Sequence, residues 1–200
     1  MKRIEKGTYG YIRAEKKKRI MITAIAFAIP VLIFFTGYFR TGTRNNLFTF
    51  VAIMGCLPAS KCAVGMIMIL LQKPMDAALH KQLSEHVKDM TVIYEATVSS
   101  YEKNVSLPCI VICGMHVVCY CTDSKVDAAF VEKHIQKMLQ WNGYRSNVKV
   151  IKDLKLFLKR VDELHVHRDE WENVPFKPDE RYPDATRNEL VKQLILCICI

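Results

Sequence analysis

Acidic side chains are missing from a long part of this 200-residue chain, because residues 20–71 contain no Asp or Glu. The same part has only three basic side chains, Arg40, Arg44 and Lys61. This scarcity of charge excludes an ordinary solvated protein surface for these residues. Two apolar runs remain, at 20–39 and 47–71. Each is long enough to cross a bilayer as a helix, which takes about 20 residues. The sequence therefore predicts a two-helix transmembrane hairpin at 20–71.

Several functional motifs are also missing. The chain has no glycine-rich phosphate loop, no Ser-His-Asp set with a nucleophile elbow and no heptad repeat. The first apolar run is longer than the ~7–15 residues of a signal-peptide core. We therefore expect it to remain as a membrane anchor.

The formal net charge of +9 is unevenly distributed. Residues 1–19 carry eight basic and two acidic side chains, whereas residues 72–200 carry 18 of each. A neutral C-terminal part argues against nucleic acid as a partner. Basic residues gather on the cytoplasmic side of membrane helices, so both termini are expected in the cytoplasm. The basic segment 1–19 should lie on anionic headgroups. A bacterial inner membrane is the expected location.

The second apolar run has an unusual centre. Small residues recur every four positions at Gly55, Ala59 and Ala63, a spacing that allows helices to approach closely. Pro58, Ser60 and Lys61 lie within the same stretch. Lys61 is near the middle of the run, where a charge is costly. Either Lys61 faces a polar inner surface of an oligomer, or its side chain snorkels to the headgroups. We expect a homo-oligomer formed through this helix.

The rest of the chain is expected to form a small cytoplasmic α/β (α+β) domain at 72–164. Apolar residues that recur every 3.6 residues indicate its helices, and apolar residues that recur every 2 residues indicate its strands. The predicted order is α-β-β-β-α-β-α: helix 76–90, strands 91–101, 105–113 and 116–122, helix 125–141, strand 147–151 and helix 153–164. Turns are expected at 102–104 and 114–115.

The C-terminal part, residues 165–200, is predicted to be a strap followed by a helix. Its first half is acidic and contains three prolines, Pro175, Pro178 and Pro183. Thr186 and Glu189 then have the spacing of a capping box. An amphipathic helix is expected to follow them.

A helix, a three-strand meander, a helix and a strand over residues 76–151 resemble the core of the restriction-endonuclease-like (PD-(D/E)xK) superfamily. That resemblance implies Mg²⁺ held by acids on the second and third strands, with a lysine beside them. Here the second strand begins Leu107-Pro108-Cys109 without a carboxylate. The resemblance would then place the site at Asp123 and Lys125 with Glu95 or Glu102. Asp123-Ser124-Lys125 also suits a helix N-cap. The domain resembles a degenerate, non-catalytic member.

Cysteines and one histidine of the meander offer a second candidate site. Cys109 and Cys113 fall on one face of their strand, as Cys119 and Cys121 do on theirs, and His116 lies between the pairs. Thiolates from both strands are suitable zinc ligands. The apolar neighbours favour the alternative, a buried face of the sheet with reduced thiols. No cofactor is expected.

Together these patterns predict a membrane-anchored scaffold, assembly or sensory protein with a non-catalytic cytoplasmic domain. Its protein partner is unknown. Two alternatives stay open: a membrane-tethered metal-dependent nuclease, and a small oligomeric channel or transporter built around Lys61.

Overall fold

The chain folds into two compact units, residues 12–73 and residues 1–11 together with 74–200. This computed structural model describes residues 4–44, 46–99, 104–172, 176 and 184–199. Its described residues form seven helices and a four-stranded mixed sheet. The fold class is therefore α+β, as the sequence predicts.

The smaller unit is a helical hairpin made of α1 (Tyr11–Thr41) and α2 (Leu47–Leu71). Both helices are long and apolar enough to cross a membrane. Asn46 caps α2 by accepting a hydrogen bond from the Thr49 amide at 2.8 Å. Helix α1 begins nine residues before the apolar run predicted at 20–39, because apolar length marks only a membrane span. Lys and Arg are also good helix formers, and Glu15 pairs with Arg19 at 2.9 Å across one turn.

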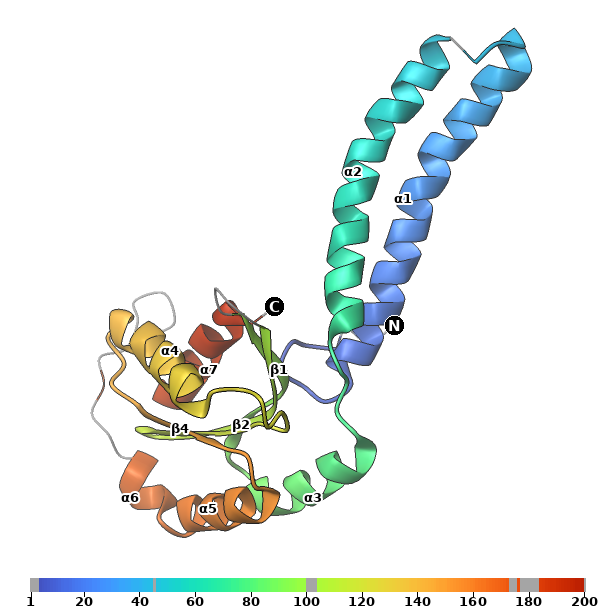
Figure 1. Cartoon of the computed structure of the whole chain (residues 1–200). Helices are drawn as coiled ribbons and strands as arrows, with labels where there is room; N and C mark the ends of the chain where they lie inside the picture. The colour runs from blue at the N-terminus through green and yellow to red at the C-terminus, as the bar shows by residue number, and fades with distance from the viewer. Residues whose placement is uncertain (1–3, 45, 100–103, 173–175, 177–183, 200) are drawn as a thin grey trace. The chain divides into compact units, whose positions relative to one another are not determined.

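The sheet of the larger unit has the strand order β1-β2-β3-β4 (Figure 1). The first three strands are antiparallel neighbours, and β4 runs parallel to β3. A parallel neighbour requires a crossover, which α4 (Ala128–Trp141) provides. The strands are β1 (Thr91–Ser99), β2 (Asn104–Cys113), β3 (His116–Tyr120) and β4 (Asn147–Ile151).

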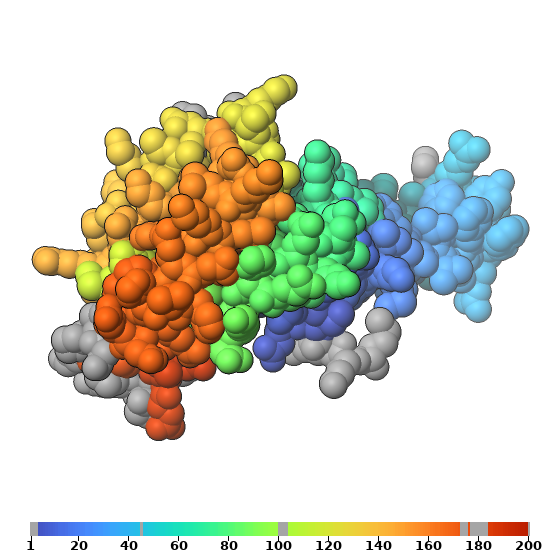
Figure 2. Space-filling view, turned by 90° about the horizontal axis from the view of Figure 1, so that it is seen from below, coloured from blue at the N-terminus to red at the C-terminus, as the bar shows by residue number. Residues whose placement is uncertain are grey.

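Helices cover both faces of this sheet (Figure 1). On one face, α4 and α7 (Arg187–Ile198) pack over a core that includes Ile110 and Ile135. On the other, α3 (Ala77–Val87) and α5 (Leu154–Val166) pack over a core that includes Val111 and Phe157. Figure 2 shows α3 in green beside α5 in orange. Two buried faces explain why β2 is apolar at nearly every position.

The C-terminal region contains one helix that the strap prediction omits. Residues Arg168–Glu172 form α6, and Trp171 lies with its ring centroid 4.6 Å from that of His116. Prolines 175, 178 and 183 lie outside the described residues, as do residues 102 and 103 of the predicted turn. The capping box of Thr186 and Glu189 is confirmed at the start of α7.

Candidate functional site

The nuclease candidates after β3 have local structural roles. The carboxylate of Asp123 accepts a hydrogen bond from the main-chain amide of Lys125 at 3.0 Å, and both residues are exposed. The cap of α4 is instead Asp127, which accepts from the amides of Ala129 and Phe130. The capping role expected for Asp123 is therefore performed by Asp127, four positions later in the sequence.

Of the two acid partners expected for Asp123, the one that the structure describes, Glu95, is not beside it. Glu95 lies on β1, and β2 separates β1 from β3. Its side chain is buried and accepts a hydrogen bond from the Met75 amide at 3.0 Å. Glu102 lies outside the described residues. Within the described part of the chain, no three Asp, Glu, His or Cys side chains form a group that could hold a metal.

The cysteine candidates fall on opposite faces of the sheet. Cys109 and Cys113 join the core under α3 and α5, whereas Cys119 and Cys121 join the core under α4 and α7. Burial raises the pKa of all four thiols, that of Cys113 to about 11. Protonated thiols that point away from one another are poor zinc ligands, so this arrangement supports the core alternative.

His116, the fifth residue of that candidate set, belongs to a different environment. Burial and the nearby Arg160 guanidinium lower the pKa of its imidazole. Its ring contacts Trp171. The ring therefore acts as a packing surface for α6.

A main-chain clip holds the N-terminal segment against the edge of the sheet. The Tyr94 amide on β1 donates to the Gly7 carbonyl at 2.8 Å. The Lys6 ammonium donates to the carbonyls of Leu196 and Cys199, at 3.1 and 2.6 Å. Cys199 itself bridges to β1 at Val98. Residues 6 and 7 are thus fixed to β1 and to the end of α7.

The chain that follows the hairpin is fixed to the next residue of β1. The Met75 amide bonds to Glu95, whose φ of +54° is rare for a residue with a Cβ. Glu95 lies opposite Pro108, which has no amide hydrogen to donate to β1. Two adjacent residues, Tyr94 and Glu95, therefore hold the two segments that flank the hairpin in the sequence. We use the name clip for these two residues together with Gly7 and Met75.

An aromatic stack supports the clip. The Tyr9 ring lies on His80 of α3 with centroids 3.9 Å apart, and His80 meets Tyr94 edge-on at 5.0 Å. Burial raises the pKa of the Tyr94 phenol to about 12. The stack joins the N-terminal segment, α3 and β1 through side chains as well as main chain.

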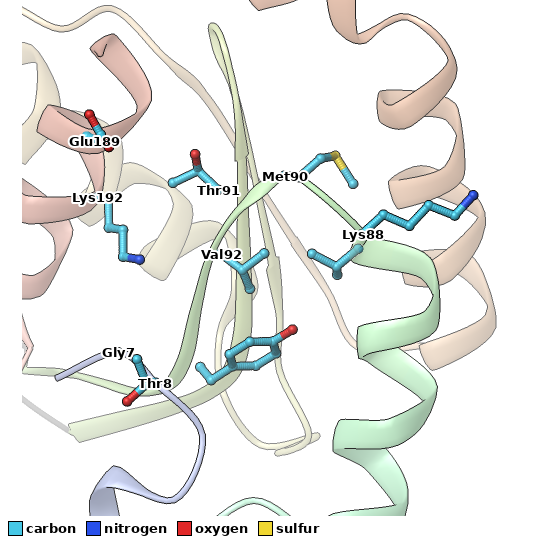
Figure 3. A pocket seen from close by; sticks show the side chains of 10 residues that line it. Gly7, Thr8, Lys88, Met90, Thr91, Val92, Glu189 and Lys192 are labelled. Carbon is cyan, nitrogen blue, oxygen red and sulfur yellow. The ribbon is translucent and has the colours of Figure 1, made fainter. Parts of the chain in front are cut away.

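A hollow of about 340 Å³ lies beside the clip (Figure 3). Gly7 and Thr8 form one wall, Val92 lies on β1, and Lys192 reaches from α7 toward the strand. Lys88 lines the rim of the hollow, but its side chain extends away from Lys192 and the hollow (Figure 3). Because the Tyr94 amide points outward from the sheet, alternation places the Val92 amide at the same open edge. Sequence reasoning missed this site, because its contacts join residues far apart in the sequence and use the main chain at Gly7, Tyr94 and Met75.

In the hairpin, the small residues of α2 face α1. Ala59 is 1% exposed, and a Cβ on Gly55 would lie 3.1 Å from Pro30. Thr23 of α1 donates to the Cys62 carbonyl at 3.3 Å, one residue from Ala63. The stripe predicted to join separate chains thus closes the hairpin itself. Three other singled-out residues are exposed: Pro58, Ser60 and Lys61.

The register of the hairpin fixes the level of Lys61. A Cβ on Gly65 would lie 3.1 Å from the Arg19 guanidinium, and the Lys16 ammonium donates to the Leu70 carbonyl at 3.0 Å. The last turns of α2 therefore run beside the basic start of α1. Lys61 is only four residues, about 6 Å, from the level of Arg19. It makes no hydrogen bond or ion pair with the described residues.

Comparison of the chain with protein-family models, with curated proteins and with solved structures gives no match.

Proposed function

We propose that this protein is a membrane-anchored scaffold or sensory protein whose cytoplasmic α+β domain is joined to a transmembrane hairpin by two short segments. The clip is the observation that carries the proposal. Gly7 is four residues before the start of α1, and Met75 is four residues after the end of α2. Since both are held by adjacent residues of one strand, a shift of either flanking segment acts directly on β1.

The two connections between the domain and the hairpin differ from a long flexible linker. A flexible linker would separate the motion of the domain from that of the hairpin. Here each connection has only a few residues beyond its hydrogen bond, and each spans at most about 14 Å. Short connections of this kind suit a protein that holds a partner at the membrane surface, or that passes a change in the membrane region to its domain.

The distribution of charge supports the proposed topology. The basic residues before α1 and after α2 favour a cytoplasmic location for both termini, with the turn at 42–46 outside. A plasma membrane of bacterial type is the proposed location. Anionic headgroups would then neutralise the basic start of α1.

The position of Lys61 is compatible with a membrane-spanning hairpin even if no acidic side chain pairs with it. If Arg19 marks the headgroup level, Lys61 enters the hydrocarbon by about one helical turn. A lysine side chain is long enough to bring its ammonium back over that distance. The register therefore supports snorkelling rather than a pore lined by Lys61.

Assembly into a homo-oligomer remains part of the proposal, but through a different surface. Because Gly55, Ala59 and Ala63 pack against α1, contacts between copies would use the outer face of α2. That face carries large exposed apolar side chains, including Ile53 and Leu57.

Native mass spectrometry of the full chain in lipid nanodiscs, with metal assayed in the same sample, tests the proposal. A defined oligomer without metal is expected. A monomer would remove the assembly role, and a stoichiometric metal ion would return the nuclease alternative to consideration. In that case, cleavage that survives Asp123→Ala would exclude the predicted nuclease site.

A further inference from the structure

One face of α4 combines aromatic rings with cations and points away from the core. Successive residues of an α-helix are rotated by about 100°. His134, Lys137 and Trp141 therefore lie within about 40° of Phe130 around the helix axis. We call these four residues the α4 stripe. Its length from Phe130 to Trp141 is about 16 Å.

The α4 stripe is exposed although it is rich in aromatic surface. Trp141 is 70% exposed and Phe130 is 43% exposed. The other side of the same helix buries Val131, Ile135 and Leu139 against the sheet. Phe130 stacks on His134 at 6.4 Å, and the Lys137 ammonium lies 4.8 Å from the Trp141 centroid, so both of these ring contacts are with neighbours on the same helix.

The charge on this side of α4 is positive. Lys133 and Lys137 are exposed. The helix contains one acid, Glu132, and its carboxylate turns toward the sheet to accept the Val150 amide at 2.8 Å. Asp127 precedes the helix, and its carboxylate binds the first amides.

The amphipathic helix α5, which has nearly the same length, has a different exterior. The outer side of α5 carries Asp162 and Glu163 among its lysines, and Glu163 pairs with Arg160 at 2.8 Å. Tryptophan, phenylalanine and lysine are enriched where a helix lies at a lipid–water interface, and between Ala128 and Trp141 no exposed acid lies among them. In the described part of the larger unit, α4 presents this combination.

We propose that the α4 stripe is a membrane-contact surface that docks the domain on the anionic leaflet of the bilayer in which the hairpin is anchored. This inference rests on the proposed membrane anchoring. Trp141 and Phe130 would enter the headgroup region, while Lys133 and Lys137 pair with lipid phosphates. The short connections at Gly7 and Met75 keep the domain at the bilayer surface, so weak contacts suffice.

Trp141 is a natural reporter for this contact. The chain has one other tryptophan, Trp171, so Trp171→Phe leaves Trp141 as the only emitter and Trp141→Phe leaves Trp171. Each single-tryptophan variant of the full chain is placed in nanodiscs that contain phosphatidylglycerol, with and without lipids brominated near the headgroup. We expect bromine to quench Trp141 and to leave Trp171 unquenched.

Charge variants make the test specific. Replacing Lys133 and Lys137 by glutamine should lower the ratio of docked to undocked domain by about fivefold per lysine. The matched control replaces Lys155 and Lys159 of α5 by glutamine and should leave the quenching of Trp141 unchanged.

Three results would overturn the inference. The first is an absence of Trp141 quenching in nanodiscs that carry the inserted chain. The second is quenching of equal strength in purely zwitterionic lipid. The third is shielding of Trp141 in detergent that increases with protein concentration, which would assign the stripe to a second copy. A chain that fails to co-purify with the nanodiscs would instead contradict the membrane anchoring itself.

Discussion

Glu95→Ala should loosen the segment that joins α2 to α3. The substitution removes the oxygen that accepts the Met75 amide at 3.0 Å, and Met75 is 4% exposed. The loss of an acceptor for a buried amide costs about 1–3 kcal/mol. Alanine has a Cβ, as glutamate does, so the backbone strain at φ +54° is not relieved.

A cost of about 2 kcal/mol corresponds to roughly thirtyfold faster opening of that hydrogen bond. Hydrogen exchange of the Met75 amide, followed by mass spectrometry of the full chain in nanodiscs, measures this change. Glu95→Gln retains an oxygen acceptor and should keep most of the protection. Glu95→Gly should be about 1 kcal/mol less destabilised than Glu95→Ala, because glycine tolerates a positive φ. If alanine and glutamine variants exchange at the same rate as the parent chain, the clip does not hold this segment.

Three further predictions concern the packing of α6, the charge of Lys61 and the buried thiols. Gly114→Ala should lower the apparent Tm more than Gly143→Ala does: both glycines have a positive φ, but a Cβ on Gly114 would overlap the Trp171 main chain, whereas a Cβ on Gly143 would meet open space. We expect Gly143→Ala to cost about 1–2 kcal/mol of stability and Gly114→Ala several kcal/mol. Equal losses of stability would contradict the packing of α6. Lys61→Leu should leave insertion intact and slightly raise the thermal stability in nanodiscs, whereas loss of assembly would show that Lys61 bonds to another copy. Stability should fall as the pH rises from about 9 to 11: burial raises the folded pKa of Cys113 and Cys199 to about 11, so the unfolded thiols lose protons first. Fluorescence-monitored urea unfolding at several pH values measures this, and a flat response would contradict the burial of both thiols.

Local periodicity was sufficient for several elements of the fold. The strand predicted at 147–151 is β4 with the same bounds, because its alternation of valine with polar residues has one register only. The apolar run at 47–71 is α2 with the same bounds. The capping box before α7 could be read from two residues, since its hydrogen bonds are local.

The separation of the cysteine pairs was also within reach of the sequence. A two-residue turn at Gly114 and Met115 places Cys113 opposite His116, and therefore Cys109 opposite Tyr120. Because directly paired residues share a face, Cys119 must point to the face opposite Cys109. The predicted turn at 114–115 therefore implies that the two cysteine pairs lie on opposite faces of the sheet.

Other features depend on long-range contacts that no local pattern reveals. Asp123 and Asp127 are both acceptable caps, and only the packing of Val131 against the sheet selects Asp127. The side of α2 that faces α1 is seen in contacts between the two helices, such as Gly55 with Pro30. The clip uses main-chain groups of Gly7, Tyr94 and Met75, which are present in every residue.

The most direct test of the account is the side of the membrane on which each part of the chain lies. Cys56 and Cys197 are the two exposed cysteines, so both variants carry Cys56→Ser. In one, Thr43 of the predicted outer turn is changed to cysteine and Cys197 to serine; the other reports on Cys197, at the end of α7. Intact cells are treated with a membrane-impermeant maleimide before and after permeabilisation. The account predicts labelling of residue 43 in intact cells and of Cys197 only after permeabilisation. The opposite pattern, or equal labelling of both in intact cells, would contradict a spanning hairpin with a cytoplasmic domain.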